Sequence, residues 1–423
     1  MSDISHILGM TSCAETCQGD LLPAPGIAPA ADPERSRRYG RARFLLCLTE
    51  FGVLVGVLAL LTLTGAARAL LGFCATPGEP LWLQHLAYLV MIGVLTRAAL
   101  FPVQLLNEFW LEHRFGLSFE TFPAWFWQWL CRSALFGVVV AALLLPVADT
   151  LRWWPYLFPA WCVVFLLVRP FLLHTLEQRL LNCFYPVRFL RNETFTVPGL
   201  GKTTLPVYEV QVSHRTRRAE ARIQLRGKRS AIYVTDTLIE AFSDGEERIV
   251  IAHEFGHLYD REHLESRTAA GVAQAQRKLM LGSVQVLAGA LALLSMQFLA
   301  PRVGLAEIHD LAGFPLLAGL TLALATAISP LLYAEARQDE RDADCYALAV
   351  TGDVENYVSV MHKLRQMNLE DTDSSAWSRL FFDTHPSYAE RIRLALEYRR
   401  RMKPKKKPPA FRGWRHVQRH GRR

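Results

Sequence analysis

Six apolar stretches, each long enough to cross a hydrocarbon core as a helix, constrain this chain more than any other feature. About 20 helical residues span a bilayer. The stretches are residues 44–65, 83–105, 126–147, 153–174, 279–300 and 311–333. A single stretch of this kind is compatible with a buried helix of a soluble protein, but six in one chain indicate a polytopic membrane protein. The composition agrees, since 51% of the residues are hydrophobic and 20% are charged.

The charged flanks of these spans predict their orientation. Arginines at positions 35, 37, 38, 41 and 43 precede the first span, which places the N-terminus in the cytoplasm. Six crossings return residues 175–277 and the C-terminal tail to that side. Residues 399–423 hold twelve Lys and Arg and no acid, and subtracting these from the net charge of +8 leaves about −4 for the rest. Beside membrane spans, we interpret the tail as an anchor on anionic lipid, with no nucleic-acid partner.

Ionisable residues also occur inside the spans or at their edges. Glu50, Arg97, Arg132 and Arg169 are costly there, so we expect them to face the bundle interior or a watery cavity. Snorkelling to the bilayer surface is the alternative for Arg132 and Arg169. The eight cysteines include no C-x-x-C pair, and we interpret them as reduced thiols rather than a disulfide framework.

The remaining segments divide around the spans. Residues 1–42 lack periodicity and are predicted to be a disordered leader, followed by four spans within 43–175. Residues 176–276 contain two predicted strands, 205–212 and 231–235, and a helix beginning near Ser243-Asp244-Gly245, because acids favour the N-terminal end of the helix dipole. Two spans then fill 277–333, a second part of the same domain fills 334–398, and the basic tail fills 399–423. The predicted fold is mainly α, a polytopic helical membrane protein with a small sheet.

A metal-binding motif lies on that helix, at His253-Glu254-Phe255-Gly256-His257. Histidines at i and i+4 lie on one helical face, where both can reach one tetrahedral zinc ion. Glu254 projects from the neighbouring face and can take a proton from an attacking water. The alternative is a helix whose histidines pair with carboxylates.

A catalytic zinc site needs a third protein ligand, and two residues are candidates. His263 has the spacing of the metzincin motif, but Asp260 stands where that motif has a glycine that turns the chain back. Glu340 lies in a predicted helix after the last span, with Asp344 one turn further on, where it can accept a hydrogen bond from a ligating imidazole. We favour Glu340, because the turn that His263 requires is missing. A solvated charged helix face is the alternative for residues 335–344.

These motifs resemble those of the CAAX prenyl endopeptidases, membrane gluzincins related to the HtpX quality-control proteases. The resemblance extends over most of residues 95–395 and indicates a prokaryotic member. Besides the zinc motif it rests on four stretches, namely Glu112-His-Arg-Phe-Gly-Leu-Ser-Phe-Glu-Thr121, Tyr233-Val-Thr-Asp236, Arg337-x-x-Glu340-x-x-Ala343-Asp344, and Thr384-His385-Pro386 followed by Arg391.

The resemblance implies an integral-membrane zinc metalloendopeptidase with one zinc ion and a gluzincin domain. Its implied ligands are His253, His257 and Glu340, with Glu254 as general base and Asp344 as orienter of a ligating histidine. It also implies that His385 donates to the oxyanion and that Arg391 supports either His385 or the substrate. The implied substrates are peptides or proteins, membrane-associated or prenylated.

The chain also departs from the family. Relatives carry Asn-Ala on an edge strand that pairs with the substrate backbone, whereas this sequence has Glu220-Ala221. Strand addition uses main-chain groups, so it is compatible with this change, while the substrate preference stays open. The alternatives to a CAAX-type protease are a quality-control protease of HtpX type, a non-catalytic zinc-binding chaperone or scaffold, and a transporter. The transporter has least support, because the spans show no repeat or interrupted helix pair.

Overall fold

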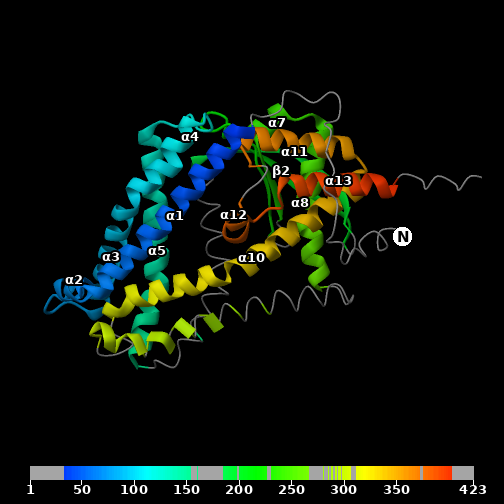
Figure 1. Ribbon diagram of the computed structural model, residues 1–423. Helices are drawn as coiled ribbons and strands as arrows, with labels where there is room; N and C mark the ends of the chain where they lie inside the picture. Colours follow the sequence, from blue (N-terminus) through cyan, green and yellow to red (C-terminus); the bar gives the residue numbers. More distant parts are fainter. Residues whose placement is uncertain are drawn as a thin grey trace, which may run out of the picture.

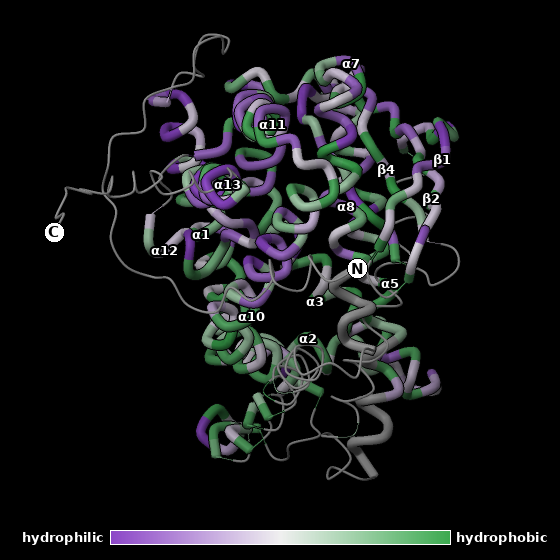
Figure 2. The backbone as a smooth tube through the Cα atoms, turned by 90° about the vertical axis from the view of Figure 1, so that its right-hand side faces the viewer, coloured by the Kyte–Doolittle hydropathy of each residue, from purple (hydrophilic) through white to green (hydrophobic). Residues whose placement is uncertain are grey.

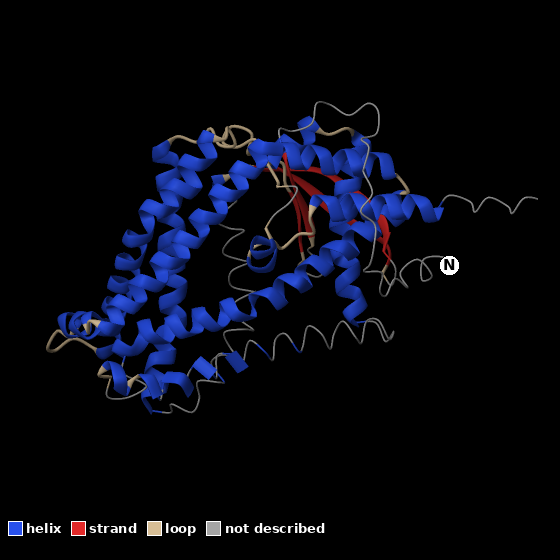
Figure 3. Cartoon of the chain, in the orientation of Figure 1, coloured by secondary structure: helices blue, strands red, loops and turns tan. Residues whose placement is uncertain are grey.

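The chain forms a bundle of long apolar helices joined to a half in which shorter helices cover a four-stranded sheet (Figures 1 and 3). The computed structural model describes residues 33–153, 160, 184–197, 200–225, 230–265, 298–305, 311–371 and 375–402, with isolated positions between 280 and 296. Coloured by hydropathy, the bundle is largely hydrophobic, whereas the elements around α11 and α13 are largely hydrophilic (Figure 2). This division is that of a membrane-embedded half and a water-exposed half.

Four helices of the described part are long and apolar enough to cross a membrane. They are α1 (Pro33–Leu63), α3 (Leu81–Gln104, continuing to Arg114), α5 (Phe122–Trp153) and α10 (Phe314–Thr351). The short helix α2 (Ala66–Cys74) follows α1. These helices account for most of each of the predicted spans 44–65, 83–105, 126–147 and 311–333. Most of the predicted span 153–174 lies outside the described residues, and 279–300 is described only at scattered positions, so the count of six stays a prediction.

The ionisable residues of these helices have polar or aromatic partners. Gln104 donates to Glu50 Oε1 at 2.6 Å, and Arg132 pairs with Glu108 at 2.9 Å. The guanidinium of Arg97 lies 5.0 Å from the ring centre of Phe136. A paired charge is less costly inside a bilayer than an isolated one. Arg169 lies outside the described residues.

Three helices cross the predicted boundaries between segments. Helix α1 begins at Pro33, within the expected leader, because Pro33 is compatible with a first helical position, Glu34 stands in the first turn and pairs with Arg38, and the Tyr39 side chain is buried. The boundary expected at 333/334 falls inside α10, which continues without a break from the span to residue 351. Helix α13 (Tyr388–Met402) includes the first four residues of the expected tail. Residues 1–32 and 403–423 lie outside the described part.

The sheet has the order β1-β2-β4-β3. Its strands are β1 (Val187–Val197), β2 (Gly201–Val210), β3 (Ala221–Gln224) and β4 (Ala231–Thr235). The pairs β1–β2 and β3–β4 are antiparallel, and β2–β4 is parallel. The two predicted strands correspond to β2 and β4, β3 lies at the edge-strand position that the resemblance implied for Glu220-Ala221, and β1 was not predicted. The short strand β3 forms one edge of the sheet.

One face of the sheet packs on helices and forms the core of the water-exposed half. Buried side chains of β2 and β4, among them Val207 and Ile232, meet Ile251 and Phe255 of α8 (Asp244–Glu265). Helices α7 (Asp236–Ala241), α11 (Val354–Asn368) and α13, together with the C-terminal end of α10, complete this half, and α12 (Ala376–Phe381) lies beside α10.

Helix α8 begins as the sequence predicts. Glu246 N–H faces Ser243 Oγ at 3.4 Å, and Ser243 N–H donates to Glu246 Oε2 at 2.8 Å, which is a capping box. The first turn also carries Asp244 and Glu247. This cap fixes where the helix starts and therefore which of its faces carries the metal-binding motif.

Candidate metal centre

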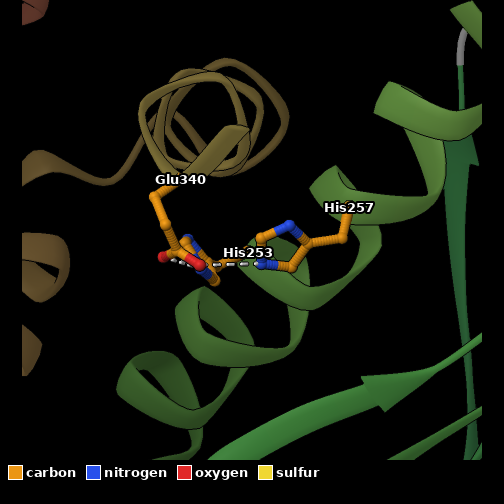
Figure 4. A group of neighbouring side chains, drawn as sticks. All are labelled: His253, His257 and Glu340. Carbon is orange, nitrogen blue, oxygen red and sulfur yellow. Dashed lines mark ion pairs between the residues drawn. The ribbon is translucent and has the colours of Figure 1, made fainter. Parts of the chain in front are cut away.

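Three side chains from two helices converge on one point (Figure 4). His253 and His257 extend from successive turns of α8, and Glu340 extends from α10. The ligand atoms of all three lie within 4.8 Å of one another. His253 Nε2 is 3.3 Å from Glu340 Oε2, and His257 Nε2 is 3.5 Å from Glu340 Oε1. The structure therefore brings together the three residues that the sequence predicts as ligands.

A glycine of the motif permits this approach of the two helices. A methyl group on Gly256 would lie 2.6 Å from Ala343 Cα and 2.9 Å from Ala343 Cβ. Real Cβ atoms do not come this close, so any other residue at position 256 would force α8 and α10 apart. Ala343 is completely buried. These two small residues place Glu340 and Asp344, on either side of Ala343 along α10, against the histidines of α8.

A chain of hydrogen bonds fixes the orientation of His253. Its Nδ1 lies 2.9 Å from Asp344 Oδ1, so Nδ1 carries the proton and Nε2 faces Glu340. Arg391 donates to both oxygens of Asp344, with Nε 2.8 Å from Oδ2 and Nη2 2.5 Å from Oδ1, the oxygen that also accepts from His253. Burial lowers the pKa of His253, but the hydrogen bonds and negative charges of Asp344 and Glu340 outweigh it and raise the pKa to about 10. The site therefore favours a proton or a cation at Nε2.

The donor set fits zinc. Two imidazole nitrogens and one carboxylate are the protein ligands of many catalytic zinc sites, which leave a fourth position open. Glu340 Oε2 is buried and faces His253 Nε2 across 3.3 Å, so a cation bound at this point would contact both atoms. A carboxylate that holds the second nitrogen of a ligating histidine is also typical of zinc sites, and Asp344 is in that position.

Glu254 lies between the metal-binding face of α8 and the edge of the sheet. Its side chain is buried, and its carboxylate accepts a hydrogen bond from the backbone N–H of Ile223 on β3. Burial raises the pKa of Glu254 to about 7, against the opposing charge of His253. A carboxylate with such a pKa is suited to accept and return a proton near neutral pH.

The edge strand presents main-chain groups toward this site. Thr235 N–H donates to the Glu220 carbonyl at 3.0 Å, which starts the pairing of β3 with β4. Along an antiparallel strand, residues whose main-chain groups bond to the neighbouring strand alternate with residues whose groups point away from it. Since Glu220 bonds to β4, the main-chain N–H and C=O groups of Ala221 and Ile223 point to the open edge of the sheet. The hydrogen bond from Ile223 to Glu254 agrees with this direction.

His263 is excluded as the third ligand by the course of α8. The helix continues without interruption to Glu265. Position 263 is six residues beyond His257, about 9 Å further along the axis at 1.5 Å per residue. Without a turn after residue 257, the backbone does not return toward the metal-binding cluster.

The structure refines the expectations for His385 and Arg391. His385 is exposed and lies beside the cluster, with Nε2 3.6 Å from Glu340 Oε1, so its role toward an oxyanion stays a prediction. Arg391 binds Asp344 rather than His385, so any support it gives acts through Asp344. Sequence reasoning also assigned no role to Arg337 within its motif. Its Nη1 donates to the carbonyls of Arg379 and Asp383, both at 2.8 Å, and holds the loop that precedes His385.

Comparisons with known proteins cover both halves of the chain. A model of peptidase family M48 matches residues 196–399. A second model, described as the CAAX prenyl protease N-terminal region with five membrane helices, matches residues 24–180. These matches identify a multi-pass integral membrane protein with a metallopeptidase half.

Two individual proteins are similar over most of their length. The chain is 25% identical to the uncharacterized metalloprotease YhfN of Bacillus subtilis (strain 168) over 334 residues, which are 74% of each protein. Its fold is similar to the crystal structure of Ste24p from S. mikatae, with a TM-score of 0.65 and 19% identity. That alignment covers 86% of this chain and 88% of the other.

Proposed function

The chain belongs to peptidase family M48, and on this premise we propose that it is an integral-membrane zinc endopeptidase of the CAAX prenyl protease type. The observation that carries the proposal is the cluster of His253, His257 and Glu340, backed by Asp344. The arginines before the first span support a cytoplasmic N-terminus and a metal centre on the cytoplasmic side.

In the proposed mechanism His253, His257 and Glu340 hold the zinc ion. When bound, zinc supplies Lewis acidity, which polarises the scissile carbonyl and makes an attacking water more acidic. Glu254 accepts the proton of that water and delivers it to the leaving amine. His385 donates a hydrogen bond to the developing oxyanion. Asp344 keeps His253 in the tautomer that directs Nε2 toward the ligand position.

We also propose that the substrate binds as an added strand along β3. Ala221 offers its outward N–H and carbonyl and Ile223 offers its outward carbonyl, while the N–H of Ile223 is hydrogen-bonded to Glu254. Strand addition of this kind takes its affinity from main-chain hydrogen bonds. It places the scissile bond beside the proposed general base.

Replacement of Glu254 by Gln tests the catalytic assignment. Purified Glu254→Gln protein in lipid nanodiscs should keep one equivalent of zinc by elemental analysis and lose cleavage of casein by at least about 100-fold, since general acid–base catalysis contributes 10²–10⁴-fold. Exposed Glu240 on α7 provides the matched control, because Glu240→Gln removes a carboxylate away from the cluster. Proteolysis retained by the Glu254→Gln protein would contradict the assignment of Glu254 as the general base.

The same variant can identify the substrate class. Proteomics of material trapped by Glu254→Gln distinguishes farnesylated CAAX peptides from fragments of integral membrane proteins. Trapping of the former, with cleavage by the wild type, supports the CAAX reading. Trapping of membrane-protein segments alone supports a quality-control protease. Zinc binding with no hydrolysis of any peptide supports a non-catalytic chaperone or scaffold.

A further inference from the structure

The segment that leads into β3 is held by the membrane half of the molecule. Leu117 of the loop after α4 (Leu111–Arg114) accepts a hydrogen bond from Arg217 N–H at 3.0 Å, and Phe119 N–H donates to the Arg215 carbonyl at 2.7 Å. Ser118 and Thr216 face each other in an isolated antiparallel bridge. Residues 117–119 therefore pair with 215–217 as a short two-stranded ladder. Gly116, with a φ of +62°, turns the chain into it.

A partly buried charged cluster at Arg218 adds to this contact. Its Nη2 lies 2.9 Å from each carboxylate oxygen of Glu112, and its Nε lies 3.2 Å from Oε2. Nη2 also donates to the hydroxyl of Tyr39, which in turn donates to Glu112 Oε1 at 2.5 Å. Arg218 and Glu112 keep only 20% and 16% of their side-chain exposure, and Tyr39 keeps 3%. Such a fork of charged hydrogen bonds fixes both distance and angle.

The position of this cluster along the chain connects it to the site. Arg218 stands two residues before Glu220, where the pairing with β4 begins, and five before Ile223, which binds Glu254. On the peptidase side, the side-chain amide of Asn368 exchanges two hydrogen bonds with Ala219, both at 3.0 Å. The residues that immediately precede β3 are therefore held by two sets of contacts. Asn368 of the peptidase half binds Ala219, and Glu112 and Tyr39 of the membrane half bind Arg218.

We propose that Arg218 is a positioning residue through which the membrane half sets the place of β3 beside the metal centre. The inference rests on the proposed role of β3 as the strand that receives substrate. Loss of the Arg218–Glu112 pair lets residues 219–224 move away from Glu254, while the metal ligands on α8 and α10 stay in place. Substrate binding then weakens more than the chemical step.

The test uses the full-length protein in nanodiscs, as wild type, as Arg218→Gln and as the charge-swapped pair Glu112→Arg/Arg218→Glu. Arg217→Gln is the matched control, because the Arg217 side chain is exposed and only its backbone joins the ladder. In hydrogen-exchange mass spectrometry, Arg218→Gln should speed exchange of amides 219–224 by about tenfold. Fluorescent casein should give a KM raised by about tenfold, which is about 1.4 kcal/mol, with kcat within about twofold and zinc affinity unchanged, because the lost hydrogen bonds join charged groups.

The charge-swapped pair should recover at least half of both effects. Unchanged exchange and KM in Arg218→Gln would overturn the inference. So would a fall in kcat and zinc affinity at constant KM, because that pattern belongs to a purely structural contact. If the wild type cleaves no peptide, the proposed function fails, and the exchange measurement alone decides whether the membrane half positions β3.

Discussion

Removal of Arg391 tests how the buried part of the metal centre is held together. The side chain of Asp344 is completely buried, and Arg391, at 13% exposure, is its ion-pair partner and contacts both carboxylate oxygens, including the Oδ1 that accepts from His253. Arg391→Met leaves this carboxylate with the hydrogen bond to His253. Breaking a buried pair by removing one partner costs about 3–5 kcal/mol. For a half of this size, at about 2–4 °C per kcal/mol, the apparent Tm should fall by about 6–20 °C.

The assay is thermal unfolding in nanodiscs with a zinc chelator present, so that stability and metal binding are measured separately. Exposed Arg393 on the same helix supplies the control, and Arg393→Met should leave Tm within about 1 °C. The double variant Asp344→Asn/Arg391→Met carries no unpaired buried charge and should regain at least half of the lost Tm. Its zinc affinity should still be about 10–100-fold weaker, because His253 has lost its carboxylate partner.

Two results would refute this reasoning. A Tm of Arg391→Met within about 2 °C of the wild type would mean that Asp344 does not depend on its partner. A double variant less stable than Arg391→Met would mean that the loss comes from packing around the long arginine side chain instead of from an unpaired charge.

Three further predictions concern separate parts of the water-exposed half. Gly256→Ala should weaken zinc affinity at least about tenfold by isothermal titration, because the added methyl group meets Ala343 and separates the two ligand-bearing helices; unchanged affinity would contradict the close packing. Glu246→Gln should lower Tm by a constant amount between pH 7 and about 5, and by progressively less as the pH falls below 4.5. Burial raises the pKa of Glu246, yet hydrogen bonds from Lys363, Ser359 and Ser243 outweigh it and lower the pKa below its ordinary value of 4.5, so ionised Glu246 stabilises the fold above pH 4.5 and this stabilisation is lost as the pH falls through the lowered pKa. A pH-independent difference would argue against the ionised pair. Glu220→Lys should shift cleavage in a peptide library from sequences with a basic residue opposite position 220 toward acidic ones, by about 1.5–5-fold; an unaltered profile would mean that substrate side chains do not face Glu220.

The parts of the site that follow from local periodicity could be predicted from the sequence. His253 and His257 share a helical face by their spacing, and Asp344 follows Glu340 by one turn, so both ligand-bearing faces were predicted before their partners were known. The contact between Arg391 and Asp344 could not be predicted in this way, because it joins positions 47 apart through the packing of α13 on α10. Gly256 was visible in the motif, but its meaning depends on which residue of the neighbouring helix comes close.

The same limit applies to the fold. The apolar spans are recognisable because their continuous apolar runs are long enough to cross a bilayer, and strands β2 and β4 because they are short runs that contain β-branched and aromatic residues. Strand β3 is four residues long and rich in polar side chains, so it carries no such signal. The change from apolar to charged residues near position 334 marked a boundary of composition, and a helix passes through that boundary unbroken.

Because α10 runs without a break from the membrane to the metal centre, a small tilt of its apolar part produces a larger displacement at Glu340. Residue 322, near the middle of its apolar part, is about 27 Å from Glu340 at 1.5 Å per residue. A tilt of the helix by ~5° about residue 322 moves Glu340 by about 2 Å, which is comparable to the length of a zinc–oxygen bond. Helices adjust their tilt to the thickness of the bilayer. Pro330, within α10, lies between the pivot and the ligand, where a missing backbone hydrogen bond lets the helix bend and absorb part of the motion. We therefore expect lipid chain length to change the distance between Glu340 and the two histidines.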